Sequence, residues 1–250
     1  MRTAEGAVSS RARAFAWGGT LLFFASLSFF LYSYVVTFGE TASLSPAGGS
    51  SGAAGEPAVL RPAFIDILLF TAFALHHSVF ARGHVRAWVA RRVPPHLERA
   101  WYVWVASLLF IAVCLLWQPV PGVAWRAEGA ARWFALGLQG VGIWLTLHSA
   151  MVIDVFELSG LRQLSPHKGA MEFKASGPYG WVRHPIYSGW ILIVFAIPTM
   201  TMTRLVFAAV SSAYLLLAIP FEERSIRAAS SGAYDAYAKQ VRWKLVPGVY

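Results

Sequence analysis

The chain has 250 residues, of which 57% are hydrophobic, 15% aromatic and only 13% charged. This composition is typical of chains embedded in a lipid bilayer and excludes an ordinary soluble domain. The net charge of +9 requires no nucleic-acid partner, because Lys and Arg gather in the cytoplasmic loops of membrane proteins and near anionic headgroups.

Four apolar runs are long enough to cross a bilayer, which needs about 20 mostly apolar residues per helix. They cover residues 14–38, 62–81, 101–117 and 133–153. A fifth apolar region, 186–220, is broken by IPTMTMTR, which predicts two short helices joined by a tight turn. We therefore expect an all-α integral membrane protein with five to six transmembrane helices, the last two forming a C-terminal helical hairpin.

The N-terminal part differs in composition from the rest of the chain. Residues 40–60 are rich in Gly, Ala, Ser and Pro, and a linker of this kind buries no core. The apolar run before it is too long for a signal-peptide core, and no A-x-A-like site follows it. We expect residues 1–60 to form a membrane anchor helix and a flexible outer linker, and residues 61–250 to form the main membrane domain.

Charge placement predicts the orientation of these spans. With the N-terminus inside, 17 of the 21 Lys and Arg residues fall in inner segments. The four outer ones are Arg61, Arg126, Arg132 and Arg204. Because cytoplasmic loops collect Lys and Arg, both termini are expected to be cytoplasmic.

Two polar inner segments, 154–185 and 221–244, flank the hairpin and are expected to meet in space. The second begins FEERSI, which places Glu222 and Glu223 at the membrane depth of His184. Opposite charges would then converge on one pocket. An EE pair that follows a span is, taken alone, more often only a solvated helix start.

The first polar segment ends in GPYGWVRHPIYSG, which begins at Gly177. Gly177 and Pro178 turn the chain, and Pro185 suits the first turn of a helix because it has no N–H to lose there. Arg183 and His184 would then lie at the helix N-terminus, which favours an anionic ligand group. An Arg-His-Pro at a helix mouth is, taken alone, usually an interfacial anchor.

Such a pocket suits a zwitterionic nucleoside with an amino-acid tail, such as S-adenosylmethionine. Its ammonium would meet a glutamate, and its carboxylate would meet the arginine or the helix terminus. Aromatic residues beside the motif would supply the walls.

GPYGWVRHPIYSG, the hairpin, FEERSI and GAYDAYAKQV together resemble the C-terminal signature of the isoprenylcysteine carboxyl methyltransferase and phospholipid methyltransferase superfamily. HSVFAR at 77–82, LLWQPVPGVAW at 115–125 and DVFELSGLRQ at 154–163 resemble the bacterial methanethiol S-methyltransferases and their NnrU-like relatives. The resemblance implies an S-adenosylmethionine-dependent methyltransferase in residues 61–250, in the bacterial inner membrane, with a cytoplasmic cofactor-binding cap.

In the superfamily, residues of this signature contact the methyl donor. The resemblance therefore implies donor-binding roles for Tyr179, His184, Pro185, Tyr187 and Glu222, and for Phe173 and Lys174 just before the turn. The turn, the helix N-terminus and the EE pair themselves add Gly177, Pro178, Arg183 and Glu223 as candidate cofactor-binding residues. His184 is also the candidate catalytic base, and no metal ligand is expected.

Ala218 stands where the isoprenylcysteine enzymes carry an arginine that can pair with the substrate carboxylate. We therefore expect a small thiol as acceptor, converting methanethiol to dimethyl sulfide. An isoprenylcysteine carboxylate, a phospholipid amine or another lipid-soluble acceptor is the alternative. Membrane lipids are expected partners, and the sequence does not predict the oligomeric state.

An alternative interpretation is a haem-binding or quinol protein, because three histidines lie within predicted spans: His76, His77 and His148. A non-catalytic NnrU-like membrane factor is a second alternative. Cys114 lies in an apolar run and is expected to be a buried small hydrophobe, which leaves no disulfide and no Cys-rich metal site.

Overall fold

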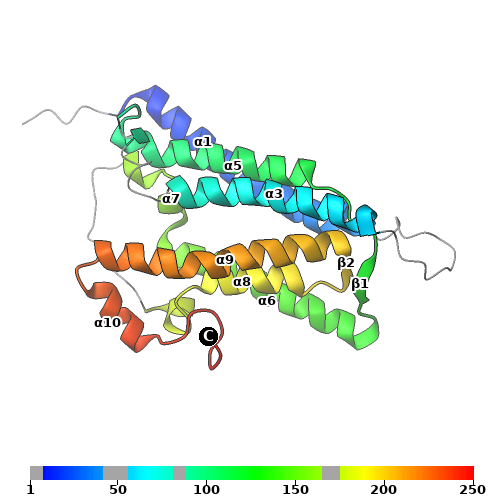
Figure 1. Cartoon of the computed structure of the whole chain (residues 1–250). Coiled ribbons are helices and arrows are strands. Elements are labelled where there is room, and N and C mark those ends of the chain that lie inside the picture. Colours follow the sequence, from blue (N-terminus) through cyan, green and yellow to red (C-terminus); the bar gives the residue numbers. More distant parts are fainter. Residues whose placement is uncertain (1–7, 42–55, 81–87, 90, 165–174) are drawn as a thin grey trace, which may run out of the picture.

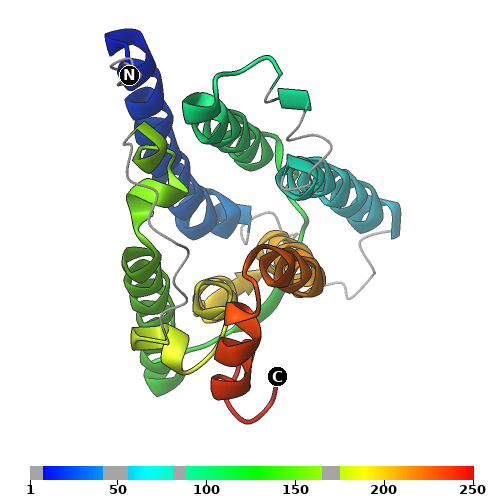
Figure 2. The ribbon, with the colours of Figure 1, turned by 90° about the vertical axis from the view of Figure 1, so that its left-hand side faces the viewer.

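The computed structural model of the chain describes residues 8–41, 56–80, 88–89, 91–164 and 175–250. Its long helices lie side by side as a bundle in both views (Figures 1 and 2). The helices are α1 (Ser10–Tyr32), α2 (Phe38–Glu40), α3 (Glu56–Phe80), α5 (Glu98–Leu116), α6 (Gly129–Ile153), α7 (Val155–Leu158), α8 (Pro185–Phe195), α9 (Met202–Ala229) and α10 (Ala233–Gln240). The shorter elements are the π-helical turn η1 (Ser33–Thr37), the 3₁₀ turns η3 (Pro95–Leu97), η4 (Arg162–Leu164) and η5 (Gly177–Gly180), and the strands β1 (Val123–Arg126) and β2 (Thr199–Thr201).

Five helical stretches of the described chain are long and apolar enough to cross a membrane: Ser10–Glu40, Val59–Ser78, Pro95–Leu116, Gly129–Ile153 and Met202–Ala229. Many of their large apolar side chains are exposed on the protein surface, which is the pattern of helices that face lipid. The predicted all-α membrane fold is confirmed, and each of the first four predicted spans has its helix.

The C-terminal hairpin differs from the prediction of two short helices. α8 has 11 residues and rises about 16 Å, which is less than the ~30 Å of a bilayer core. It ends where Pro198 disfavours the helical conformation at Ile197. α9, by contrast, has 28 residues and contains Pro220, and it continues past the apolar region because Glu and Arg are good helix formers. The prediction is wrong for the second helix, which carries Glu222 and Glu223 within it.

An aromatic cluster joins α1, α8 and α9 at the centre of the bundle. The ring of Phe30 stacks on Trp190 at 4.7 Å and on Phe207 at 5.2 Å. Tyr34 is fully buried beside them, and its hydroxyl donates to the Val194 carbonyl. Such ring pairs contribute about 0.5–1.5 kcal/mol each beyond their burial, so this cluster fixes α8 against its neighbours.

Close backbone packing fixes α8 against α6. A Cβ added to Gly142 would lie 2.8 Å from the Gly189 carbonyl oxygen, and one added to Gly189 would lie 2.7 Å from the Gly142 carbonyl oxygen. Small residues let helices approach in this way inside membranes, where lipid is as apolar as a side chain. Gln139 adds a hydrogen bond of 3.0 Å to the Ile193 carbonyl.

β2 lies between the C-terminal end of α8 and the N-terminal end of α9, and it pairs antiparallel with β1. Arg204 ties this region to the end of α1, where η1 begins. Its guanidinium donates to the carbonyls of Tyr34 and Val35 in η1 and to the Thr199 carbonyl. A π-helical turn shifts the backbone bonding and frees carbonyls for such donors. Gly39 leaves room for the side chain, because a Cβ there would lie 2.3 Å from Nη2.

Candidate functional site

The candidate site begins where η5 leads into α8. Gly177 has a φ of +54°, a conformation that glycine adopts without strain, and Pro185 is the first residue of α8. The backbone N–H groups of Arg183 and His184 donate to the carbonyls of Trp243 and Lys244, both at 2.9 Å. The C-terminal tail therefore closes over the start of the helix, and the predicted segments 154–185 and 221–244 meet through these backbone bonds.

The start of α8 offers less to an anion than expected. Pro185 has no N–H, and the N–H groups of Tyr187 and Ser188 bond to the His184 carbonyl. Within the described chain, this leaves the Ile186 N–H as the donor of the first turn without a protein partner. The helix dipole remains, but only one backbone donor faces outward for a ligand.

Glu222 is the accessible carboxylate of the site. The hydroxyl of Tyr187 donates to its Oε2 at 2.7 Å, and Nδ1 of His184 lies 3.8 Å from the same oxygen. The Glu222 side chain is 42% exposed, and the His184 and Tyr187 rings stack at 5.4 Å beside it. A carboxylate with one hydroxyl donor and an open side can still accept a bond from a cation.

Glu223 is buried, and two arginines of the protein compensate its negative charge. Its Oε1 accepts from Arg183 Nε at 2.8 Å and lies 3.3 Å from His184 Nε2, and its Oε2 accepts from Arg227 Nη2 at 3.3 Å. Its side chain is only 5% exposed. The two adjacent glutamates are therefore not equivalent, since Glu223 holds neighbouring side chains while Glu222 faces outward.

Arg183 joins Glu223 to the C-terminal tail. Beyond its bond to Glu223, Nη1 donates to the carbonyls of Val241 at 2.9 Å and Arg242 at 2.7 Å. The side chain is 8% exposed. Two of its three nitrogens have protein acceptors, so this geometry favours a role in positioning the tail over a direct contact with a ligand.

His184 is neutral near pH 7 in this environment. Burial lowers the pKa of its imidazole below the usual range, and the nearby carboxylates of Glu222 and Glu223 offset this only in part. A proton on Nε2 suits donation to Glu223, which leaves Nδ1 as an acceptor on the side of Glu222. A neutral ring with a free acceptor nitrogen is competent to accept a proton.

α10 packs behind the site. Tyr234 and Tyr237 are both buried, and the Tyr237 hydroxyl donates to the Tyr179 carbonyl at 2.9 Å. Burial raises the pKa of Tyr237 to about 12, and burial also raises the pKa of Tyr179. Both groups therefore remain neutral phenols, and α10 fixes the conformation of η5.

A second polar pair lies on α3 and α5, at the same end of the bundle. The hydroxyl of Tyr102 hydrogen-bonds to Nδ1 of His77, and Arg99 lies 4.9 Å above the Tyr102 ring. Tyr102 also interacts electrostatically with Tyr187 and Glu222. The sequence analysis named His77 among the three span histidines of the haem alternative and within the HSVFAR motif, but it did not identify Tyr102 as its partner.

The structure brings most of the predicted residues to one end of the bundle. Phe173 and Lys174 lie outside the described residues. Those brought together are Gly177, Pro178, Tyr179, Arg183, His184, Pro185, Tyr187, Glu222 and Glu223. In the part of the chain that the structure describes, no group of three or more His, Cys, Asp or Glu residues is placed to hold a metal ion.

Known proteins resemble this chain along most of its length. No family model matches it, and no solved structure matches it. Methanethiol S-methyltransferase 2 of Bradyrhizobium diazoefficiens is 33% identical over 241 residues, which cover 91% of this chain and 93% of that protein. Methanethiol S-methyltransferase of Mycobacterium tuberculosis is 37% identical over 71% of this chain and 75% of its own length.

A more distant similarity extends to a human protein. Nurim of Homo sapiens is 28% identical over 83% of this chain and 90% of its own length. The bacterial relatives are more similar, and the Bradyrhizobium protein covers 91% of this chain, which confirms the resemblance seen in the sequence motifs. The chain belongs to the methanethiol S-methyltransferase family.

Proposed function

We propose that this protein is an S-adenosylmethionine-dependent methyltransferase of the bacterial inner membrane that converts methanethiol to dimethyl sulfide. The observation that carries the proposal is the identity of 33% to a methanethiol S-methyltransferase across 93% of that relative. Ala218, which removes the arginine expected for a carboxylate substrate, supports the same acceptor. The haem-binding interpretation is less favoured, because Nδ1 of His77 is hydrogen-bonded to the Tyr102 hydroxyl.

The residues of the site fit the chemistry of this methyl donor. In the proposal, the half-exposed carboxylate of Glu222 pairs with the donor's ammonium, and Tyr187 orients that carboxylate through its hydroxyl. The stacked rings of His184 and Tyr187 form one wall. Arg183 and Glu223 act as positioning residues, because their charges compensate each other and hold the C-terminal tail against α8.

The chemistry of the proposed reaction explains why a membrane bundle suits it. When bound, the donor supplies an electrophilic methyl group on a positively charged sulfur. Methanethiol must lose its proton, and its sulfur then forms a bond to the methyl carbon as the old carbon–sulfur bond breaks. Opposite charges disappear in this step, so a site that excludes water favours it.

Two groups can take the thiol proton in this proposal. The neutral imidazole of His184 carries an acceptor nitrogen beside Glu222. The His77–Tyr102 pair lies on α3 and α5, across from Tyr187. Each would assist because an ordinary thiol has a pKa of about 8.5 and is mostly protonated at pH 7.

The substrate proposal is tested with membranes that contain the full chain. Supplied with S-adenosylmethionine and methanethiol, they should release dimethyl sulfide, measured by headspace gas chromatography, whereas membranes with Glu222→Gln should release far less. Radiolabelled donor offered with a prenylcysteine or phosphatidylethanolamine gives the comparison. Label that appears in either of those acceptors, with no dimethyl sulfide, would refute methanethiol as the substrate.

The proposed orientation places the site end in the cytoplasm. Ser231 lies in the exposed turn between α9 and α10, and Ala130 lies exposed at the start of α6, at the opposite end of the bundle. The native Cys114 is buried and should not react. In intact cells, Ala130→Cys should react with a membrane-impermeant thiol reagent and Ser231→Cys should not. The reverse labelling would place the site outside.

A further inference from the structure

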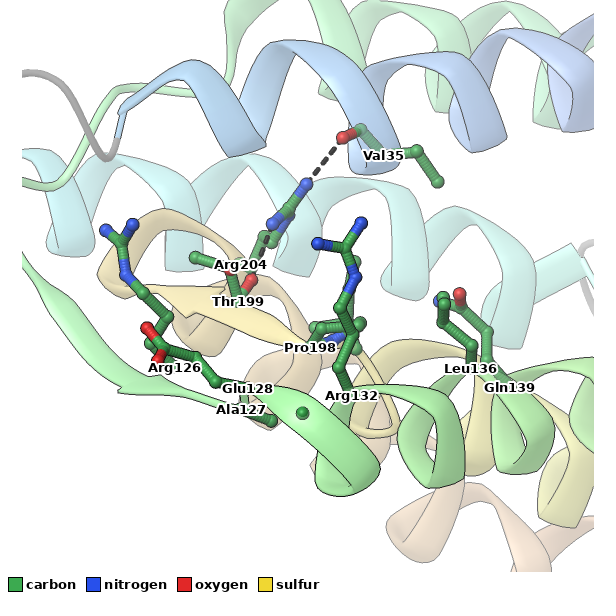
Figure 3. Close-up of a pocket in the computed structure, with 12 residues that line it drawn as sticks. Val35, Arg126, Ala127, Glu128, Arg132, Leu136, Gln139, Pro198, Thr199 and Arg204 are labelled. Atoms are coloured by element: carbon green, nitrogen blue, oxygen red, sulfur yellow. Dashed lines mark hydrogen bonds between the residues drawn. The ribbon is translucent and has the colours of Figure 1, made fainter.

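Three of the four basic residues that charge placement assigns to the outer side line a single pocket. Arg126, Arg132 and Arg204 surround a cavity of about 520 Å³ between β1, the start of α6 and the start of α9 (Figure 3). Arg204 lies 18 positions before Glu222 on α9, which corresponds to about 27 Å at 1.5 Å per residue. This pocket is therefore separate from the proposed methyl-transfer site.

The charges in this pocket are not balanced by the protein. Arg204 is bonded to backbone carbonyls, and among the described residues Arg126 and Arg132 have neither an ion pair nor a hydrogen-bond acceptor. Both are exposed and stand on either side of Arg204, with their guanidinium groups turned the same way (Figure 3). Three guanidinium groups face one lining carboxylate, that of Glu128.

The backbone adds to the positive potential. α6, with 25 residues, begins at Gly129, which lines the pocket, and its N-cap Glu128 makes no side-chain capping bond. The N–H groups of the first turn therefore have no side-chain acceptor at that cap, and the N-terminal end of a helix dipole is positive. The arginine pair and the N-terminal end of α6 therefore both favour the binding of an anion.

The pocket is also partly apolar. Val35 is 50% exposed and Leu136 is 37% exposed, and Ile197 and Pro198 complete this side of the lining. Both exposed residues belong to stretches that are long and apolar enough to cross the membrane. A small soluble anion would contact the arginines alone, whereas a lipid would place its headgroup on the arginines and its acyl chains on this apolar surface.

We propose that this pocket binds the phosphate of an anionic phospholipid, with Arg126 and Arg132 on the headgroup and the acyl chains against Val35 and Leu136. The three arginines outnumber Glu128 in the lining and Glu40 in the adjoining pocket, and this excess of positive charge favours an anionic headgroup over a zwitterionic one. Binding would fill the pocket between β1 and η1, and this role does not depend on which acceptor is methylated.

The test compares lipid retention by the full chain in native mass spectrometry. Detergent-purified protein is titrated separately with phosphatidylglycerol, phosphatidylethanolamine and inorganic phosphate. The double variant Arg126→Gln/Arg132→Gln removes the unpaired charges, and Arg61→Gln is the matched control, since Arg61 is an exposed arginine assigned to the same side that does not line the pocket. Thermal unfolding without added lipid should be equal in the two variants.

The expected result is saturable binding of phosphatidylglycerol to the wild type and to Arg61→Gln. The double variant should bind it more weakly, by roughly fivefold for each arginine removed. Unchanged binding in the double variant overturns the proposal. If inorganic phosphate binds as tightly as the lipid, the pocket binds free phosphate and the proposal of a phospholipid ligand is wrong. If phosphatidylethanolamine binds as tightly as phosphatidylglycerol, the preference for an anionic headgroup is wrong.

Discussion

The two ends of the bundle each bury an arginine, but they satisfy it in different ways. At the proposed methyl-transfer end, Arg183 pairs with the Glu223 carboxylate and two carbonyls of the tail. At the opposite end, Arg204 is 5% exposed and bonds only to backbone carbonyls among the described residues. At the first end, the charge of Arg183 is therefore compensated by Glu223, and the half-exposed carboxylate of Glu222 is the group proposed to meet a cation. The second keeps a net positive charge, which suits an anion.

This contrast separates residues that hold the structure from residues that are proposed to meet a ligand. Glu223 and Arg204 are buried and multiply bonded, so their loss should be felt mainly in stability. Glu222, Arg126 and Arg132 are exposed or half-exposed, so their loss should be felt mainly in binding.

The largest expected effect on stability is that of Glu223→Leu. The substitution leaves the buried charge of Arg183 without its carboxylate, and breaking a buried pair costs about 3–5 kcal/mol. Thermal or denaturant unfolding in detergent measures the loss. The neighbouring variant Glu222→Leu is the matched control and should cost only about 1 kcal/mol, because it loses the one hydrogen bond from Tyr187. Equal destabilisation of both would contradict the division of roles between the two glutamates.

A slightly smaller loss is expected for Arg204→Met. The carbonyls of Tyr34, Val35 and Thr199 lose their donor, and a buried polar group without a partner costs about 1–3 kcal/mol. We expect a total of roughly 3 kcal/mol, because relaxation and other donors recover part of the sum. Arg132→Met, an exposed arginine of the same pocket, should be close to the wild type. If both variants unfold alike, Arg204 is not the tie between α9 and η1.

The packing of α6 on α8 is tested by a pair of alanine substitutions in one helix. Gly142→Ala places a Cβ 2.8 Å from the Gly189 carbonyl oxygen, and overpacking of this kind costs about 1–3 kcal/mol. Gly137→Ala has nothing within 4 Å of the added Cβ and should be neutral or slightly stabilising. A neutral Gly142→Ala would show that the two helices can separate at no cost.

The smallest expected effect is the pH dependence contributed by His184. Its pKa is lowered in the folded state, so the unfolded chain binds more protons once the pH falls below the ordinary histidine range. Stability should be flat above about pH 7 and should fall as the pH drops below about 6.5, by at most 1.4 kcal/mol per pH unit. Unfolding midpoints of the wild type and of His184→Gln between pH 5 and 8 measure this. A variant with the same acid slope would assign it to another group.

Much of the fold could be predicted from the sequence, because apolar runs report membrane spans directly. The GPY, RHP and EE motifs also predicted that Tyr187, His184 and Glu222 would meet, and the structure places them together. What failed was local detail at the ends of helices. α9 continues through its polar residues because they favour helix as much as the apolar ones do.

Other contacts between distant segments, and the atoms that make them, could not be predicted. The bond between His77 and Tyr102 depends on which faces of α3 and α5 meet, and hydropathy does not report this. The bond from Arg204 to η1 joins residues 170 positions apart and depends on a π-helical turn that has no clear sequence signal. The tail carbonyls that cap Arg183 and His184 are backbone groups, which any residue type supplies.

The central claim is that Glu222 is the carboxylate that meets the methyl donor, and calorimetric titration tests it most directly. The full chain in detergent is titrated with S-adenosylmethionine or its demethylated product, alongside Glu222→Gln and the control Glu157→Gln, an exposed glutamate of α7. A lost charged hydrogen bond is worth about 1.5–3 kcal/mol, so Glu222→Gln should bind roughly 10- to 100-fold more weakly while Glu157→Gln binds as the wild type does. Wild-type affinity in Glu222→Gln would contradict the account.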